Sequence, residues 1–423
     1  MRRILLPVIA ILLPVFSFGQ FTYSWSTFTT GNSGLPDDLV TSLAYTSEDT
    51  LWIGTASGLA YLKDSTVATE TEFPLHYITA LATDDAGALW IGTAGNGCFR
   101  RLGPGNYVPY NTVTTSGQLT TDQILSLHCD GDSTWIGTDG EGLFLLYNSG
   151  WNHFHSGNHP FAWQIDQVYS VTADAQNRVW FGTSQSGAVR RNVLGTYWKF
   201  GQDSGFRYNH VRKIALQGDS LAWIGMASTG GDSALAAYNI NTGTVRHYGS
   251  PDPNGYIQQN VWDIFIDSDN RKWIASNQTE HGLLLYNDTA FTAFGEFTSG
   301  ILSNRTYAVA QDDSNRIWVG SFRGLSVNKT ISTLSVEPAP LLVAGVYPNP
   351  ASDIIHLNFS SEDQEVSISV LDLGGRTLMN RSVSCIPGAL TTADLDISSC
   401  PPGIYLLRIF TGNFVKNLKV IKL

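Results

Sequence analysis

The stretch Asp84-Asp85-Ala86-Gly87-Ala88-Leu89-Trp90-Ile91-Gly92-Thr93 is one copy of a phrase that recurs along this chain of 423 residues. An aspartate followed by Gly or Asn closes a tight hairpin, because these residues tolerate positive φ angles. Related phrases surround seven tryptophans, which are Trp52, Trp90, Trp135, Trp180, Trp223, Trp273 and Trp318. Successive tryptophans are 38 to 50 residues apart, a period typical of propeller blades.

Each copy predicts four short antiparallel strands. An apolar pair such as Ile78 and Leu81 precedes the turn, and a glycine with an alternating apolar run follows it, as in Gly142-Leu143-Phe144-Leu145. An aromatic segment such as 151–154 ends the copy. One such sheet cannot bury both of its apolar faces, but seven sheets stacked around an axis cover each other. We therefore expect an all-β fold with a seven-bladed β-propeller over residues 20–334.

The ends of this region indicate how the ring closes. The seventh copy has no aromatic fourth strand after Gly324-Leu325-Ser326-Val327-Asn328, whereas Trp25-Ser26-Thr27-Phe28 precedes the first copy and resembles one. An unpaired strand edge would be a template for aggregation. We expect the N-terminal strand to complete the last blade, with the latch between residues 24–29 and 324–330.

The first nineteen residues have the three parts of a secretory signal peptide. Met1-Arg2-Arg3 is basic, residues 4–16 are apolar, and Ser17-Phe18-Gly19 provides small residues before Gln20. We expect cleavage between Gly19 and Gln20. The apolar run is too short to span a bilayer comfortably and no later segment reaches 18 apolar residues, so no transmembrane helix is expected.

Charge argues against nucleic acid as a partner. The formal net charge is −11, which repels phosphate backbones. Four cysteines in an exported chain can pair in three ways. The pairs Cys98 with Cys129 and Cys385 with Cys400 need the least long-range closure, and buried free thiols are the alternative.

Residues 335–345 are expected to form a linker, and residues 346–423 a small β-sandwich of immunoglobulin-like type. Val346-Tyr347-Pro348-Asn349-Pro350-Ala351-Ser352-Asp353 is a turn-rich opening, and strand patterns follow at 355–359, 366–370, 403–409 and 415–423.

Two family resemblances follow from these motifs. The seven phrases resemble the two-component regulator propeller repeat, which often forms extracytoplasmic sensors of hybrid kinases, notably carbohydrate sensors of Bacteroidetes. This chain shows one ring and no kinase, so a signalling output does not carry over. The C-terminal segment resembles the type A sorting domain of the type IX secretion system of Bacteroidota. Its matching positions are Pro348, Asn349, Pro350, Asp353, Gly374, Gly375, Arg376, Gly403 and Tyr405.

The second resemblance implies that the secretion machinery is a partner. It implies recognition by the outer-membrane translocon, removal of the domain, and then attachment to the cell surface or release. An apolar residue usually occupies the position of Cys400.

Propellers generally bind ligands with the loops around one mouth of the central channel. The candidates here enter the inner strands or follow the Trp-Ile-Gly-Thr phrases: Asp38, His76, Asp122, Asp139, Glu141, Asp166, Asn209, His210, Asn260, Glu280, His281, Asn304, Arg305 and Arg323. Their variation between copies suits a binding surface, although unconstrained loops also vary. Trp163, Tyr208 and Trp262 could stack on sugar rings, and burial between blades is their alternative.

No metal or cofactor is expected. His153, His155 and His159 lie on an aromatic outer strand without a paired carboxylate, and Asp267-Ser268-Asp269-Asn270 fits hairpin chemistry better than a calcium loop.

These observations favour a secreted or cell-surface binding module with a glycan or peptide ligand. The alternative is a propeller enzyme, a lyase or glycosidase similar to streptogramin lyase, that uses His210 with His281 or Glu280. A third possibility is structural adhesion without a small ligand.

Overall fold

The computed structural model describes residues 24–46, 49–158, 163–228, 233–248, 260–277, 281–329, 341–361, 363–372, 376–386, 389–411 and 414–423. The expected signal peptide, its cleavage site, Glu280, His159, Gly374 and Gly375 lie outside these residues. The chain divides into two compact units, Met1–Thr330 and Ile331–Leu423.

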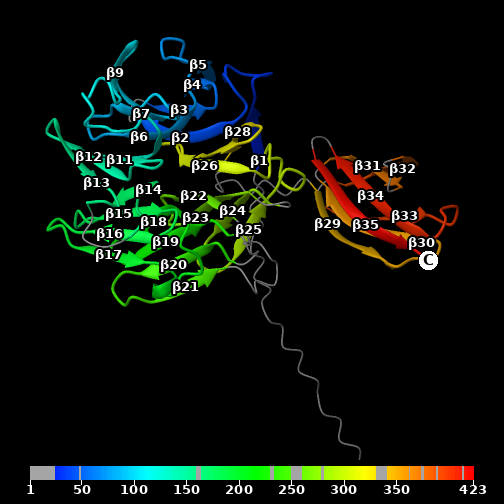
Figure 1. Ribbon diagram of the computed structural model, residues 1–423. Coiled ribbons are helices and arrows are strands. Elements are labelled where there is room, and N and C mark those ends of the chain that lie inside the picture. Colours follow the sequence, from blue (N-terminus) through cyan, green and yellow to red (C-terminus); the bar gives the residue numbers. More distant parts are fainter. Residues whose placement is uncertain are drawn as a thin grey trace, which may run out of the picture. The chain divides into compact units, whose positions relative to one another are not determined.

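The first unit consists of seven four-stranded antiparallel sheets, which we number as blades 1 to 7 (Figure 1). Blade 1 contains β2 (Val40–Thr46), β3 (Thr50–Thr55), β4 (Gly58–Lys63) and β5 (Thr66–Thr69), and blade 2 contains β6 (Ile78–Thr83), β7 (Leu89–Thr93), β8 (Cys98–Gly103) and β9 (Asn106–Tyr110). Blade 3 contains β10 (Ile124–Asp130), β11 (Ser133–Thr138), β12 (Leu143–Tyr147) and β13 (Gly150–Phe154), and blade 4 contains β14 (Val168–Ala173), β15 (Val179–Thr183), β16 (Ala188–Arg191) and β17 (Tyr197–Phe200).

The remaining blades follow the same order. Blade 5 contains β18 (Val211–Gln217), β19 (Leu221–Met226), β20 (Leu235–Asn239) and β21 (Val245–Tyr248). Blade 6 contains β22 (Val261–Ile266), β23 (Lys272–Ser276), β24 (Leu283–Tyr286) and β25 (Phe291–Phe294). Blade 7 contains β26 (Thr306–Gln311), β27 (Ile317–Ser321), β28 (Gly324–Lys329) and β1 (Ser24–Phe28), and a short 3-10 turn at Gln202–Ser204 precedes blade 5.

The ring closes as the sequence predicts. Strand β1 pairs antiparallel with β28, from Ser24 opposite Lys329 to Phe28 opposite Leu325. The inner strands contact each other in ring order, and β26 of blade 7 contacts β2 of blade 1. The predicted latch is therefore confirmed.

Close approach between blades explains the glycine of the repeated phrase. A Cβ at Gly54 would lie 2.6 Å from Cγ2 of Ile78 in the next blade. At the seam of the ring, a Cβ at Gly320 would lie 2.6 Å from Cγ1 of Val40. Real Cβ atoms do not approach other atoms so closely, so any larger residue here would push neighbouring blades apart.

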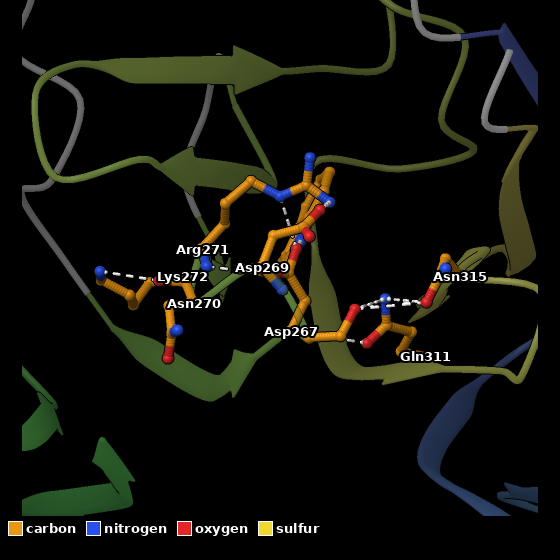
Figure 2. A network of polar contacts seen from close by, with 9 residues as sticks. Asp267, Asp269, Asn270, Arg271, Lys272, Gln311 and Asn315 are labelled. Carbon is orange, nitrogen blue, oxygen red and sulfur yellow. Dashed lines mark hydrogen bonds and ion pairs between the residues drawn. The ribbon is translucent and has the colours of Figure 1, made fainter. Parts of the chain in front are cut away.

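An aspartate lies six residues before the tryptophan in four blades and accepts its indole N–H. The pairs are Asp84 with Trp90, Asp174 with Trp180, Asp267 with Trp273 and Asp312 with Trp318, at 3.2, 2.9, 2.8 and 2.7 Å. An arginine also donates to each carboxylate, and in blade 6 this is Arg271 at 2.7 Å (Figure 2). The acidic turn thus anchors the tryptophan, and Asp267 serves as a hydrogen-bond acceptor within its own hairpin.

The second unit has two sheets, in the orders β29-β30-β33 and β32-β31-β34-β35. Its strands are β29 (Leu341–Tyr347), β30 (Ile354–Ser361), β31 (Glu365–Leu371), β32 (Thr377–Ser384), β33 (Leu390–Asp396), β34 (Gly403–Thr411) and β35 (Phe414–Lys422). Strand β29 begins within the stretch expected to be linker. The Asn349 side chain donates to the Lys419 carbonyl and accepts the Ile421 N–H, both at 2.9 Å. The motif at the start of this unit is therefore fastened to the last strand.

All four cysteines are free thiols, so neither expected disulfide is present. Cys98 and Cys129 share one apolar cluster, and Cys385 and Cys400 share another. The thiol of Cys129 is directed at the Thr134 hydroxyl, 3.9 Å away, and that of Cys385 at the Val383 carbonyl, 3.5 Å away. Burial raises the pKa of Cys129 to about 12, which keeps this thiol protonated and unreactive.

Candidate functional site

A cavity of about 460 Å³ lies where the inner strands of all seven blades converge. Its lining comes from β2, β6, β10, β14, β18, β22 and β26. We call it the channel cavity. Since every blade contributes to its lining, it is a natural place for a site built from the whole ring.

A β-bulge places one side chain from each blade at this cavity. The pairing of each inner strand with its neighbour shifts register at the second residue, and bulges of this kind re-aim a side chain. The seven bulge residues line the cavity and are Thr41, Thr79, Leu125, Tyr169, Arg212, Trp262 and Tyr307. Blades 1 to 3 thus contribute aliphatic or hydroxyl side chains, and blades 4 to 7 contribute three aromatic rings and a cation.

The side chains of blades 4 to 7 contact one another. The Arg212 guanidinium carbon lies 3.9 Å from the ring centroid of Trp262 and 5.6 Å from that of Tyr169. The rings of Trp262 and Tyr307 meet edge to face at 5.2 Å, and those of Tyr169 and His210 lie 4.9 Å apart. A guanidinium held over an indole is attracted by its π face and has a restricted orientation.

Burial sets the protonation states of these side chains. It raises the pKa of Tyr169 and Tyr307, so both phenols remain neutral O–H donors. Burial, aided by the charge of Arg212, lowers the pKa of His210 to about 4, so the imidazole is neutral at pH 7. Burial also lowers the pKa of Arg212, but an arginine stays charged throughout the physiological range.

Several polar atoms at the cavity have no hydrogen-bond partner. Among the described residues these are Nε of Arg212, Nε1 of Trp262, and the hydroxyl oxygens of Ser42 and Thr79. Unsatisfied buried polar groups are costly and uncommon in native proteins. Four such atoms on residues that line one cavity make its lining polar as well as aromatic.

Most residues that the sequence nominated have a different role. Asp38, Asp122, Asp166, Asn209 and Asn304 each accept the backbone N–H of a residue that follows the outer strand of the preceding blade, at 2.7 to 2.8 Å. This position repeats as Asp or Asn because it ties successive blades together. His76 occupies it in blade 2 and instead stacks on Phe99 at 5.7 Å.

Other loop residues that the sequence nominated also make contacts within the propeller. Asp139 accepts the Gln167 amide at 2.6 Å, Glu141 accepts the Thr120 hydroxyl at 3.2 Å, and Arg323 is paired with Glu296. Arg305 lies over Phe322 at 5.3 Å, and the Asn260 carbonyl accepts the Asn277 N–H. His281 precedes β24 and is not part of the cavity lining.

His210 is the nominated loop residue that contacts a cavity side chain, through Tyr169. The suggested stacking residue Trp262 lines the cavity, whereas Trp163 and Tyr208 do not. Sequence reasoning missed Tyr169, Arg212 and Tyr307. The sequence did contain a signal for them. The second residue of each inner strand changes in chemistry from copy to copy, whereas the first residue is always Val, Ile or Thr.

Within the described ranges, no cluster of three or more His, Cys, Asp or Glu side chains is arranged to hold a metal ion. The same ranges contain no helix with the length and apolar character needed to cross a membrane.

Comparison with known proteins supports both units. Residues 345–423 match the family model described as secretion system C-terminal sorting domain, and residues 34–57 match that of the two component regulator propeller. Both predicted resemblances, and the all-β propeller fold, are confirmed. A propeller with such a tail is a secreted or cell-surface module.

Three relatives illustrate the likeness. A histidine kinase P4 of Formosa agariphila is 24% identical over 204 residues, which cover 46% of this chain and only 14% of the kinase. The extracellular domain of the putative hybrid two component system BT3049 of B. thetaiotaomicron has a TM-score of 0.63 at 17% identity, over 95% of this chain and 57% of that chain. PorZ of Porphyromonas gingivalis, a surface component of the type-IX secretion system, has a TM-score of 0.52 at 16% identity, over 92% and 60%. At these identities the solved structures establish the fold.

Proposed function

We propose that the propeller is an extracellular ligand-binding module, exported by the type IX machinery through its C-terminal unit, and that its ligand binds at the channel cavity. The bulge ring is the observation that supports this proposal. A purely structural position would repeat from blade to blade, as the Asp or Asn caps do. The bulge residues instead change from threonine and leucine to tyrosine, arginine and tryptophan.

The geometry gives this surface the means to bind. Aromatic side chains supply contact area with little loss of conformational freedom, and a preorganised arginine supplies directional hydrogen bonds. Arg212 is held over Trp262 at 3.9 Å before any ligand arrives.

A glycan and peptide array probed with the mature chain tests the proposal. Trp262→Ala should lose the array signal, because it removes the ring on which Arg212 rests. Trp198→Ala is the matched control, since Trp198 is 38% exposed on outer strand β17 and absent from the cavity lining. If both variants bound as well as the original chain, the channel cavity would not be the binding site.

The enzyme alternative depends on His210 with His281 or Glu280. An imidazole with a pKa of about 4 is a weak base at neutral pH, so the geometry does not favour it as a second function. Replacing His210 and His281 with Ala should leave binding largely intact in a binding module and abolish turnover in an enzyme.

A further inference from the structure

We infer that the channel cavity selects an acidic sugar, with the guanidinium of Arg212 receiving a carboxylate or sulfate group attached to a sugar-sized ring. This inference rests on the proposed binding function and goes further, because it states the chemical class of the ligand. Three properties of the cavity support it, namely its excess of hydrogen-bond donors, its local charge and its aromatic lining.

The polar side chains that line the cavity are chiefly able to donate hydrogen bonds. The Arg212 guanidinium and the Trp262 indole can only donate, and the Thr79 hydroxyl can donate as well as accept. The neutral phenols of Tyr169 and Tyr307 add two further O–H groups to the lining. A bound group that satisfies such a surface must be rich in acceptors, as carboxylates and sulfates are.

The cavity is positive within an acidic protein. Its charged lining residues are Arg212, Lys213 and Asp263, which gives two cations against one anion, or +1. Lys213 and Asp263 pair with each other at 2.8 Å, and Asp263 also accepts the Val309 N–H at 2.9 Å. Of the three charged residues that line the cavity, Arg212 is therefore the one for which the described part of the chain shows no ion pair. The formal net charge of the whole chain is −11.

The rings around Arg212 favour a cyclic ligand over a bare ion. Tyr169 and Trp262 flank the guanidinium at 5.6 and 3.9 Å, and Tyr307 extends the aromatic wall. Aromatic rings offer an apolar face for the C–H groups of a pyranose. A volume of about 460 Å³ lies within the range of small-molecule sites, so it is large enough for one sugar residue.

Titration calorimetry with the mature full chain compares three probes, which are D-glucuronate, neutral D-glucose and inorganic sulfate. We expect glucuronate to bind about tenfold more tightly than glucose, because a charge-assisted contact to arginine is added. Sulfate should bind more weakly than glucuronate, because it lacks the ring. Arg212→Met keeps the length of the side chain and removes the charge, so it should abolish the preference for glucuronate over glucose.

Arg246→Met is the matched control. Arg246 is also in blade 5 and lies 4.9 Å from the Tyr248 ring, but on the outer strand β21 and away from the cavity. This variant should bind glucuronate as the original chain does. Tryptophan fluorescence melts of both variants verify folding.

Different failures have different meanings. Equal binding of glucose and glucuronate, both lost in Trp262→Ala, would overturn the acidic class and leave the binding function intact. Equal binding of sulfate and glucuronate would show that the sugar ring contributes nothing, and this result would also overturn the acidic-sugar class. Arg212-dependent binding of a glutamate-rich peptide that is tighter than the binding of glucuronate would overturn it as well. If the array signal survived Trp262→Ala, the proposed function itself would fail.

Discussion

Replacing Asp174 with Asn should destabilise the propeller strongly, although the two side chains have the same shape. The Asp174 carboxylate is completely buried, and its Oδ2 accepts the Trp180 indole N–H at 2.9 Å and the Arg178 Nε–H at 2.6 Å. Its Oδ1 accepts the turn amides of Gln176 and Arg178, at 3.2 and 2.9 Å. Asparagine can preserve one oxygen for these amides, but it places an NH₂ group against two donors.

The expected loss is about 3 kcal/mol. Hydrogen bonds to a charged group contribute roughly 1.5–3 kcal/mol each, and breaking a buried pair costs about 3–5 kcal/mol. Arg178 keeps 24% of its side chain exposed and can turn to water, which reduces the total. The fully buried Trp180 indole cannot do so.

The assay is urea unfolding followed by tryptophan fluorescence. All twelve tryptophans lie in the first unit, so this signal reports on the propeller alone. Gln217→Ala in blade 5 is the comparison, because Gln217 supplies the same indole acceptor to Trp223 at 2.9 Å through a neutral amide. That variant should lose about 1 kcal/mol. A loss below about 1 kcal/mol for Asp174→Asn would refute the reasoning that the charged acceptor anchors the blade.

Lowering the pH should also destabilise the propeller, because it protonates the Asp174 carboxylate. Burial alone would raise the pKa of Asp174, but the hydrogen bonds from Trp180 and Arg178 outweigh it and lower the pKa below 3.8. The resulting stabilisation is present above the unfolded pKa and is lost as the pH falls through the lower folded value. The Asn variant should lack this contribution to acid unfolding, which urea titrations between pH 5 and pH 2 would measure.

Further predictions concern the seam, the acid response and the second unit. Deleting residues 20–29 should leave the edge of β28 unpaired and cause association, measured by light scattering, whereas deleting only 20–23 should not. The pKa of His210 falls to about 4 from 6.5 on folding, so the unfolded chain takes up the proton first and stability falls as the pH drops through that window. His210→Gln should therefore flatten the dependence of the melting temperature on pH between pH 6.5 and 4, and an unchanged slope would contradict the assignment. Asn349→Ala should raise the exchange rate of the Ile421 amide hydrogen about tenfold, since about 1–1.5 kcal/mol of local hydrogen bonding is lost; unchanged exchange would show that this contact does not hold the last strand.

The blade architecture could be predicted from the sequence because its determinants are local. A repeated turn, a tryptophan and an alternating apolar run each specify a strand or hairpin within one copy. The missing aromatic strand after Asn328 and the surplus one at 25–28 even indicated how the ring closes.

The ligand site depended on the tertiary structure. Whether a loop residue faces the channel or caps the neighbouring blade is set by contacts between copies, which spacing within one copy does not contain. Asp122 and Asp166 therefore looked like binding residues but hold adjacent blades together. The side chain of Arg212 reaches the channel because a bulge re-aims it and Trp262, 50 residues later in the sequence, lies beneath it. Periodicity determined the ring by itself, whereas only the packing of seven non-identical blades decided which side chains meet at its centre.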